Sequence, residues 1–243
     1  MSKSVFGKIN SIQTLGTLDG PGVRFVVFMQ GCFLRCGCCH NPDTWDINAG
    51  QEYSAFDLAE KAEHYKDYFG KNGGVTLSGG EPLMQSEFAA EFFKECKKKN
   101  IHTCLDTSGA VLNDEVKELL KFTDLVLLDI KYTTDEDYKK YVGCSMSSVL
   151  EFLEYLSSRN IPVILRQVII PTLNDKDENI LRLSEIQKKY SNIKKTELLA
   201  FKKLCQVKYD NLKIDFPFKD LPVPTASDIE RLSHQLQSYL NNK

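Results

Sequence analysis

The chain has 243 residues, of which 42% are apolar, and its formal net charge is −2. This apolar fraction is enough for one sizeable core, and a single domain over residues 1–243 is expected for such a length. The nearly balanced charge argues against a general nucleic-acid binder, which would present a strongly basic face.

The N-terminal stretch "MSKSVFGKINSIQTLG" has neither the apolar core nor the cleavage site of a signal peptide, and no later stretch is long and apolar enough to cross a bilayer. We therefore expect a cytoplasmic protein without a membrane partner. Thiols stay reduced in the cytosol, so clustered cysteines there more often bind metal or take part in chemistry than form disulfides.

In chain order, the first predicted strand is "VRFVVFM" at 23–29, and a helix follows at 54–69, where Ser54 and Asp57 form a capping-box pattern. The next elements are a strand at 74–78, a helix over "SEFAAEFFKECKKK", a strand at 102–106 and a helix at 113–121. The strands are short and apolar throughout, which is typical of parallel strands buried on both faces.

The second half continues the alternation with strands at 124–130, 162–170 and 196–200, and with helices at 147–159, 176–190 and about 226–241. Six strands that alternate with helices predict right-handed βαβ units and a mostly parallel sheet. An open doubly wound sheet and an incomplete barrel both satisfy this pattern. Both folds place ligands at the carboxyl ends of the strands.

Polar residues stand at these strand ends. Glu81 follows the second strand, Asp106 ends the third, and Asp129 and Lys131 end the fourth. The predicted site therefore coincides with the residues that are unusual for a buried sheet.

Four cysteines fall within "GCFLRCGCCHNPDTW" at 31–45, directly after the first predicted strand. Cys32, Cys36 and Cys39 form a C-x₃-C-x₂-C pattern, which can ligate three corners of an iron–sulfur cube. A closed cube needs four cysteines, and none stands at a comparable local spacing, so one iron would stay open for substrate chemistry.

Two other interpretations of the cluster are open. Zinc could use Cys36, Cys39 and His40, although structural zinc sites usually have two separated knuckles and no second knuckle is present. The thiols could also be an accidental group without a ligand. Cys38 is the spare thiol of the cluster, either a small apolar residue or an additional ligand.

The cysteine pattern after a first strand, followed by "SGGEP" at 78–82, resembles the radical S-adenosylmethionine superfamily. Within it, "GTLDGPGVRFVVFMQGCFLRCGCCHNPDTW", "GGVTLSGGEPLMQ", "IHTCLDTSG" and "TDLVLLDIK" are similar, in this order, to glycyl-radical-enzyme activating enzymes, from about residue 5 to about residue 200. The stretch "HNPDTWDINAGQEYS" carries no ferredoxin-like insertion, as in the type that activates pyruvate formate-lyase.

The resemblance implies an incomplete (β/α)₆ TIM-like barrel of the radical SAM type. It also implies a [4Fe–4S] cluster on Cys32, Cys36 and Cys39, whose open iron is chelated by S-adenosylmethionine. One electron from the cluster cleaves that cofactor to methionine and a 5′-deoxyadenosyl radical, which abstracts hydrogen. The protein supplies orientation and exclusion of water.

The resemblance further assigns roles at the strand ends. Gly79, Gly80 and Glu81 receive the amino group of S-adenosylmethionine, although a simple strand-to-helix turn would also explain the glycines. Asp129 and Lys131 hold the same cofactor, as do Asp106 and Thr107; a plain ion pair between Asp129 and Lys131 is the alternative. Arg166 interrupts an apolar strand and needs a carboxylate partner, either the methionyl carboxylate or a structural one.

Other assignments also depend on the resemblance. Asp106, Thr107 and Asp129 would bind K⁺ or Na⁺ near the cofactor carboxylate, since hard cations prefer oxygen ligands. Cys38 and Asn41 lie at positions near the adenine, where the family usually has an aromatic residue in place of Cys38. Asp19 corresponds to a residue that contacts the glycine-bearing loop of the partner, although it could simply form the turn in "LDGPGVR".

One segment departs from the family. "LLAFKKLCQVKY" at 198–209 replaces a pattern similar to "LLPYH…GKxKY", so that Lys202 stands where a histidine near the cofactor is expected. Cys205 replaces a glycine, and Gln206 replaces a lysine. Lysine keeps a hydrogen-bond donor but cannot accept as imidazole does.

The sequence therefore predicts an activating enzyme that abstracts a glycine α-hydrogen from a glycyl radical enzyme, with pyruvate formate-lyase as the expected partner. Flavodoxin or ferredoxin would be the electron donor, and we expect a monomer. One alternative is a radical enzyme that activates a different glycyl radical enzyme or that acts on a small-molecule substrate. A second is a non-catalytic zinc or iron–sulfur protein that carries electrons.

Overall fold

The computed structural model describes residues 4–242, which form two compact units. The first unit comprises residues up to Phe33 together with Thr44–Leu127, and the second comprises Leu34–Asp43 and the chain from Leu128 onward. The short segment Leu34–Asp43, which carries three of the four clustered cysteines, thus belongs to the second unit. The division does not test the expected single domain, which stays a prediction.

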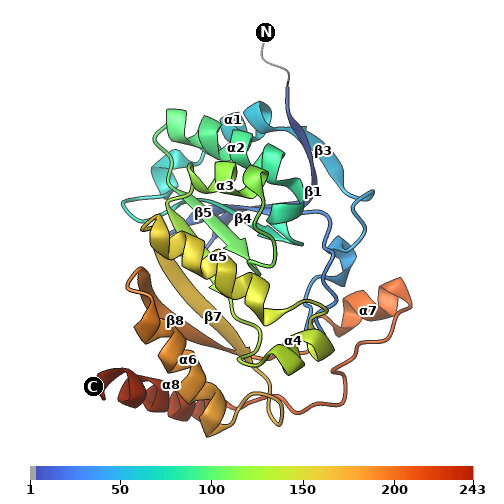
Figure 1. The fold of residues 1–243 in the computed structure, drawn as a ribbon. Helices are drawn as coiled ribbons and strands as arrows, with labels where there is room; N and C mark the ends of the chain where they lie inside the picture. The colour runs from blue at the N-terminus through green and yellow to red at the C-terminus, as the bar shows by residue number, and fades with distance from the viewer. Residues whose placement is uncertain (1–3, 243) are drawn as a thin grey trace. The chain divides into compact units, whose positions relative to one another are not determined.

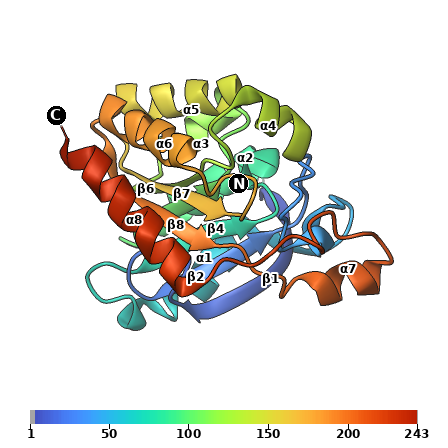
Figure 2. The same cartoon turned by 90° about the horizontal axis from the view of Figure 1, so that it is seen from below.

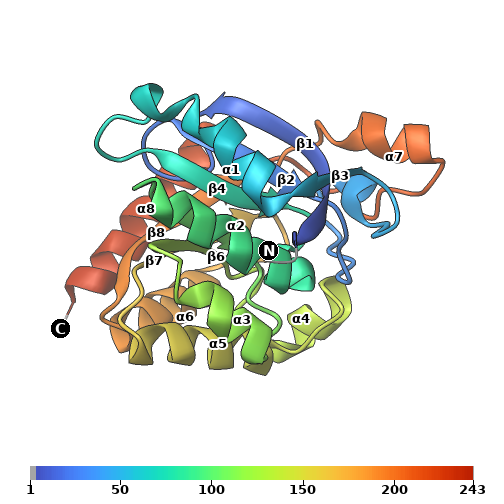
Figure 3. The ribbon, with the colours of Figure 1, turned by 90° about the horizontal axis from the view of Figure 1, so that it is seen from above.

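The first unit contains a mixed sheet, with strand order β3-β1-β2-β4-β5. Its strands are β1 (Phe6–Gly16), β2 (Arg24–Met29), β3 (Gln51–Ser54), β4 (Gly74–Gly79) and β5 (Thr103–Thr107). β1 pairs antiparallel with β2 and β3, whereas the pairs β2–β4 and β4–β5 are parallel. Figure 3 labels β1, β2, β3 and β4 together with the helices of the same unit, and Figure 1 labels β5.

Three of these strands are confirmed to within about one residue at each end, but β1 and β3 were not predicted. Both carry polar side chains, and the burial of β1 alternates along the strand instead of being continuous. An antiparallel strand at or near a sheet edge has one solvated face. Such a strand lacks the continuous apolar run that predicts a strand buried on both faces.

The helices of the first unit are α1 (Ala55–Glu63), α2 (Ser86–Lys98) and α3 (Asp114–Leu120). Ser54 caps α1 as expected, since its hydroxyl accepts the amide of Asp57 at 3.0 Å. The predicted helix at 54–69 was too long, because α1 ends at Glu63 and only a short 3₁₀ turn, Lys66–Tyr68, follows.

The strand β6 (Leu125–Asp129) carries the chain from the first unit into the second. The second unit continues with the parallel pair β7 (Val163–Ile169) and β8 (Ile193–Ala200). Its helices are α4 (Asp135–Tyr141), α5 (Met146–Ser158), α6 (Asp177–Lys189), α7 (Gln206–Leu212) and α8 (Ala226–Asn241). Figures 1 and 2 show α8 lying beside β8 and α6.

The last helix is held by its cap and by its apolar stripe. Thr225 and Asp228 form a complete capping box at its start. Leu232 and Leu236 pack with Ile169 of β7 and Ile180 of α6, all at most 1% exposed. Two short helices, α4 and α7, were not predicted. Each buries a single residue, Tyr138 or Tyr209, and so shows no apolar stripe, whereas α3, of the same length, buries Val116, Leu119 and Leu120.

From β3 onward, strands alternate with helices along the chain, and the pairs β2–β4, β4–β5 and β7–β8 are parallel, which confirms the α/β class. None of the helices between residues 4 and 242 is long and apolar enough to span a membrane.

Candidate active site

The first cysteine stands where two parallel strands end. Beyond Met29 the amide of Gly31 donates to Thr44 at 2.6 Å, and the amide of Gly80 donates to the Met29 carbonyl at 2.9 Å. The chain that enters Cys32 is therefore fixed beside the carboxyl end of β4. Cys32 itself is partly exposed.

Gly79 and Gly80 make this close approach of backbones possible. Gly79 has a φ of +96°, and a Cβ there would lie 2.6 Å from the Met29 nitrogen. A Cβ on Gly80 would lie 2.2 Å from the carbonyl oxygen of Gly31. The turn thus has a structural reason for both glycines, and their contact with a cofactor stays a prediction.

Glu81 is only 2% exposed, and its carboxylate accepts four hydrogen bonds. The donors are the Thr107 hydroxyl at 2.5 Å, the Ser108 hydroxyl at 2.5 Å, the Ser108 amide at 3.0 Å and the Leu83 amide at 3.2 Å. Burial raises the pKa of Glu81, and these hydrogen bonds oppose the shift. Glu81 therefore joins the ends of β4 and β5. The sequence did not predict that Ser108 takes part in this junction.

Two further predicted residues of the first unit are held by neighbouring side chains. Asp106 accepts the Ser78 hydroxyl at 2.8 Å. The backbone carbonyl of Asp19 accepts the Thr76 hydroxyl at 2.7 Å. The same Thr76 oxygen lies 2.5 Å from Nε of Arg24, so the Asp19 turn rests on a buried arginine.

Arg24 was not predicted as a site residue, although "GPGVR" contains it. Its side chain is 0% exposed and donates to the carbonyls of Pro21 at 3.0 Å and Val75 at 2.6 Å. Burial lowers the pKa of the Arg24 guanidinium, whereas Cys104, Asp124 and Asp19 raise it. A cation in this place ties the Asp19 turn to the start of β4.

The other three clustered cysteines, Cys36, Cys38 and Cys39, lie on a loop of the second unit, Leu34–Asp43, which we call the cysteine loop. The amides of Arg35 and Gly37 donate to the carbonyls of Val142 at 3.1 Å and Tyr141 at 2.9 Å, just after α4. A turn brings Cys36 and Cys39 together, with the Cys39 amide 3.0 Å from the Cys36 carbonyl. Both residues are partly exposed.

Cys38 differs from its neighbours in its chemistry. Although the residue as a whole is partly exposed, burial raises the pKa of its thiol to about 11, against the opposing effect of Lys131. The role of Cys38, as a small apolar residue or as an additional ligand, stays a prediction.

Asp129, at the end of β6, joins two cations. Its carboxylate oxygens lie 2.5 Å from Lys131 Nζ and 3.0 Å from Arg166 Nε, and the three side chains are 11–19% exposed. Burial opposes the charge of Asp129, but Arg166 and Lys131 outweigh it and hold its pKa well below the usual value. Asp129 therefore forms an ion pair with Lys131 and is also a structural carboxylate partner of Arg166.

Lys131 also connects this group to the cysteine loop. Burial disfavours its charge, but Asp129 and the thiols of Cys36 and Cys38 hold its pKa well above the ordinary value. A cation near cysteine thiols favours their deprotonated form, which is the form that ligates metal.

The late segment that departs from the family meets the cysteine loop. Lys202 is exposed, and its backbone carbonyl lies 2.9 Å from His40 Nε2. Asn41 accepts a hydrogen bond from Lys208 Nζ at 2.9 Å, and the Tyr209 hydroxyl donates to the Cys39 carbonyl at 3.1 Å. Lys208 and Tyr209 were not predicted as functional residues, although "VKY" contains both.

The chemistry of the donors fits an iron–sulfur cluster, whose irons take cysteine thiolates. Three partly exposed cysteines lie within eight residues of chain. Tyr132 is 2% exposed, and its hydroxyl has no hydrogen-bond partner among residues 4–242. Its pKa is raised by burial and then by the charges of Cys38, Tyr141 and Cys36. A buried hydroxyl of this kind can serve a bound group.

Across residues 4–242, no three His, Cys, Asp or Glu side chains are arranged to hold a single metal ion. The expected K⁺ or Na⁺ ligands Asp106, Thr107 and Asp129 stay a prediction.

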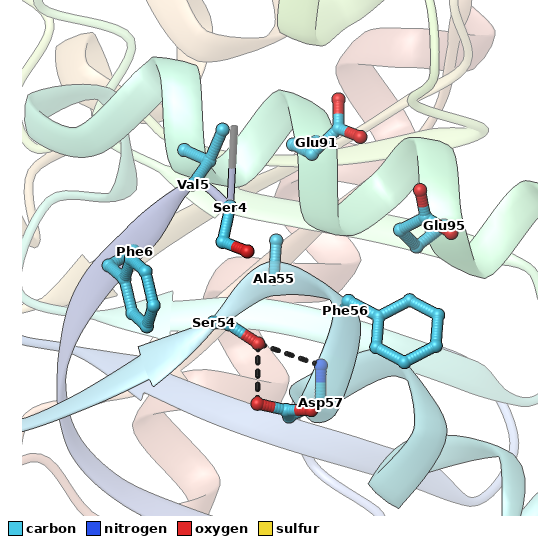
Figure 4. A pocket seen from close by; sticks show the side chains of 9 residues that line it. All are labelled: Ser4, Val5, Phe6, Ser54, Ala55, Phe56, Asp57, Glu91 and Glu95. Atoms are coloured by element: carbon cyan, nitrogen blue, oxygen red, sulfur yellow. Dashed lines mark hydrogen bonds between the residues drawn. The ribbon is translucent and has the colours of Figure 1, made fainter. Parts of the chain in front are cut away.

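A pocket of about 250 Å³ lies elsewhere in the first unit, where β1 begins and α1 meets α2 (Figure 4). Phe6, Phe56, Glu91 and Glu95 line it, together with the Ser54–Asp57 cap of α1. None of the predicted cofactor residues contributes to it, and we assign no function to it.

This chain is similar to known proteins over nearly its full length. Residues 26–184 match the profile of the Radical SAM superfamily. The chain is 41% identical over 239 residues to the pyruvate formate-lyase 1-activating enzyme of Escherichia coli K12, covering 97% of each chain. It is 43% identical over 237 residues to the pyruvate formate-lyase-activating enzyme of Clostridium pasteurianum, covering 97% of this chain and 99% of the relative.

Solved structures show the same fold at low identity. Streptococcus suis SuiB bound to its precursor peptide aligns over 88% of this chain and 45% of its own, with a TM-score of 0.68 and 18% identity. A domain of pyruvate-formate lyase-activating enzyme from Bacteroides vulgatus aligns over 69% of this chain and 94% of its own, with a TM-score of 0.57 and 21% identity. These likenesses confirm the incomplete TIM-like barrel of the radical SAM type.

Proposed function

This chain belongs to the radical SAM superfamily, and from that premise we propose that it is an activating enzyme that installs a glycyl radical on pyruvate formate-lyase. The observation that carries the proposal is 41–43% identity, over nearly the full length, to enzymes with that name. The cofactors that this family implies are a [4Fe–4S] cluster and S-adenosylmethionine.

In this proposal Cys32, Cys36 and Cys39 hold the cluster by their thiolates. The chemistry that the bound cluster supplies is the one-electron reductive cleavage of S-adenosylmethionine. Lys131 stabilises the thiolates of its neighbours, because its ammonium is buried beside them.

Other residues of the chain would bind and orient the cofactor. Gly79 and Gly80 would receive the amino group of the cofactor at the end of β4, and Glu81 fixes that turn to Thr107. Lys131 and Arg166 offer cationic groups that suit the methionyl carboxylate, with Asp129 orienting both. Asn41, Cys38 and Lys202 would lie near the adenine.

A monovalent cation is a further part of the proposal. Asp106, Thr107 and Asp129 offer the oxygen ligands that K⁺ or Na⁺ prefers. Activity that is the same in potassium, sodium and a bulky organic cation would count against this site.

The partner side of the proposal uses Asp19, whose turn is held by Arg24 and Thr76 and would contact the glycine-bearing loop. Flavodoxin or ferredoxin would supply the electron. We place the enzyme in the cytoplasm as a monomer, under anaerobic conditions, because a cube with an exposed iron reacts with oxygen.

The test is an anaerobic incubation with pyruvate formate-lyase, a reductant and S-adenosylmethionine, followed by electron paramagnetic resonance. We expect the doublet of a glycyl radical with the wild-type chain and with Cys38→Ser, and no doublet with Cys36→Ser. A doublet only on another glycyl radical enzyme would correct the partner. No doublet on any such enzyme would refute the activating function.

A further inference from the structure

The segment Phe201–Lys219 follows β8 and contains α7, and we call it the α7 strap. An aromatic cluster holds it in shape: Tyr209 and Phe216 have ring centroids 4.7 Å apart, and Phe201 and Phe216 6.2 Å apart. Its two ends meet where Lys203 Nζ donates to the Lys219 carbonyl at 2.6 Å. The proposed function gives the strap no role beyond Lys202.

The strap contacts the cysteine loop at several points along its length. Tyr209, which is 0% exposed, donates its hydroxyl to the carbonyl of Cys39 at 3.1 Å. Lys208 Nζ lies 2.9 Å from both Asn41 Oδ1 and Asp43 Oδ1. The Lys202 carbonyl lies 2.9 Å from His40.

The strap also packs against the middle of the loop. A Cβ on Gly37 would lie 2.3 Å from Cζ of Phe218, so this ring stands directly against the loop backbone. Phe218 packs in turn on Tyr141 at a centroid distance of 5.7 Å, and the Tyr141 carbonyl accepts the Gly37 amide. The loop is therefore held between the end of α4 and the α7 strap.

We propose that Tyr209 and Lys208 are positioning residues that hold the cysteine loop in its ligating shape and so govern how firmly the cluster is retained. The proposal rests on the proposed function only in taking Cys36 and Cys39 as cluster ligands. Hydrogen bonds to the residues that bind a metal directly fix the orientation of those residues, and loss of the hydrogen bonds weakens metal binding. Tyr209 acts on the backbone of Cys39 itself, and Lys208 acts on the loop just after it.

The two contacts differ in strength. Tyr209 is a buried residue and its hydrogen bond to Cys39 is part-buried. Removing one such bond corresponds to a change of about three- to tenfold. Lys208 and Asp43 have side chains that are 36% and 34% exposed, so their ion pair is screened by solvent and is worth only about two- to fivefold. Tyr209→Phe should therefore have the larger effect.

The experiment compares Tyr209→Phe and Lys208→Met with matched controls. Tyr155→Phe removes a hydroxyl from α5, and Lys213→Met removes an exposed ammonium from the end of α7. Lys208→Arg keeps the cation and should restore wild-type behaviour. All variants are melted as metal-free proteins to compare their overall stability.

Two measurements are made on each protein under anaerobic conditions. The first is amide hydrogen exchange of residues 35–43 in the metal-free protein, which needs no cluster. The second is the rate of iron release to a chelator from the reconstituted protein. We expect both to rise by about three- to tenfold in Tyr209→Phe and about two- to fivefold in Lys208→Met, with unchanged melting temperatures and unchanged controls.

Exchange and iron release at wild-type rates in both variants would overturn the proposal. Equal increases in Tyr155→Phe or Lys213→Met would also overturn it, because the effect would then not be specific to the contacts with the loop. A wild-type protein that takes up no iron and sulfide would refute the proposed function instead, and the exchange measurement would still decide whether the strap holds the loop.

Discussion

At the scale of single residues, the carboxylate of Glu81 is matched to donors on both of its oxygens. The Leu83 amide donates to Oε1, and the Ser108 amide donates to Oε2. Backbone amides cannot turn away, unlike the hydroxyls of Thr107 and Ser108. Only a carboxylate offers an acceptor to both amides at once.

Glu81→Gln should therefore destabilise the metal-free protein, although it is nearly isosteric. Whichever way the new amide turns, its NH₂ faces one of the two backbone N–H groups. We expect a loss of about 1–3 kcal/mol in the free energy of unfolding at pH 7, measured with urea. Glu115→Gln on the exposed face of α3 is the control and should have no effect. Equal stability of the two variants would contradict this account of Glu81.

Asp129 gives a prediction with a pH dependence. Asp129→Asn leaves Lys131 and Arg166 buried beside a neutral group, which should cost about 3 kcal/mol in the free energy of unfolding at pH 7. The pKa of Asp129 is lower in the folded state than its ordinary value of 3.8. Its contribution is thus complete above about pH 5 and fades as the pH falls through the ordinary value toward the lower pKa of the folded state.

The measurement is the difference in unfolding free energy between the wild type and Asp129→Asn, in the metal-free state, from pH 7 to pH 3. This difference should be constant down to about pH 5 and then shrink. A difference that grows on acidification would show that Asp129 does not carry its charge as described.

Residues whose chemistry is local could be predicted from the sequence, and residues whose partners are distant could not. The cysteine pattern was recognisable because its three cysteines lie within eight consecutive residues. The partner of Arg166 was left open because Asp129 stands 37 positions earlier in the chain. Lys208 and Tyr209 were missed because their contacts with the cysteine loop span more than 160 positions.

At the scale of elements, the ends of β2 and β4 are the junction on which Cys32 depends. Gly80 lies so close to the carbonyl of Gly31 that no side chain fits between them. Since the obstacle is backbone and not a flexible side chain, an added methyl group must push the two strand ends apart.

Gly80→Ala should lower the free energy of unfolding by about 1–3 kcal/mol and should also reduce the iron retained after reconstitution. Gly70→Ala is the control, because nothing lies within 4 Å of its Cβ position and its cost comes only from a φ of +56°. Iron analysis and melting curves separate the two effects. Full iron content in Gly80→Ala would contradict the importance of this junction for Cys32.

Elements were predictable where burial gives them a clear period. The buried parallel strands β4 and β6 read as continuous apolar runs, and α2 and α8 show wide apolar stripes. β1 alternates between buried and exposed positions, β3 is mostly exposed, and α4 and α7 each bury a single residue. Their positions depend on tertiary packing, which the local pattern does not record.

At the scale of the whole molecule, the sequence shows no composition change at the borders of the two units. The second unit includes the cysteine loop, which is separated in sequence from the rest of that unit by residues 44–127. Lys202 stands where a histidine is expected. Its contact with His40 uses the backbone carbonyl and so does not depend on the side chain at this position. The family resemblance therefore survives this departure, with 41% identity over 97% of the chain.

The central claim is that a cluster on three cysteines binds S-adenosylmethionine at its open iron. The most direct measurement is the electron paramagnetic resonance spectrum of the anaerobically purified and reduced protein, recorded before and after S-adenosylmethionine is added. We predict a reduced [4Fe–4S] signal that changes on addition. Zinc in place of iron, or a cluster signal that S-adenosylmethionine leaves unchanged, would contradict the account.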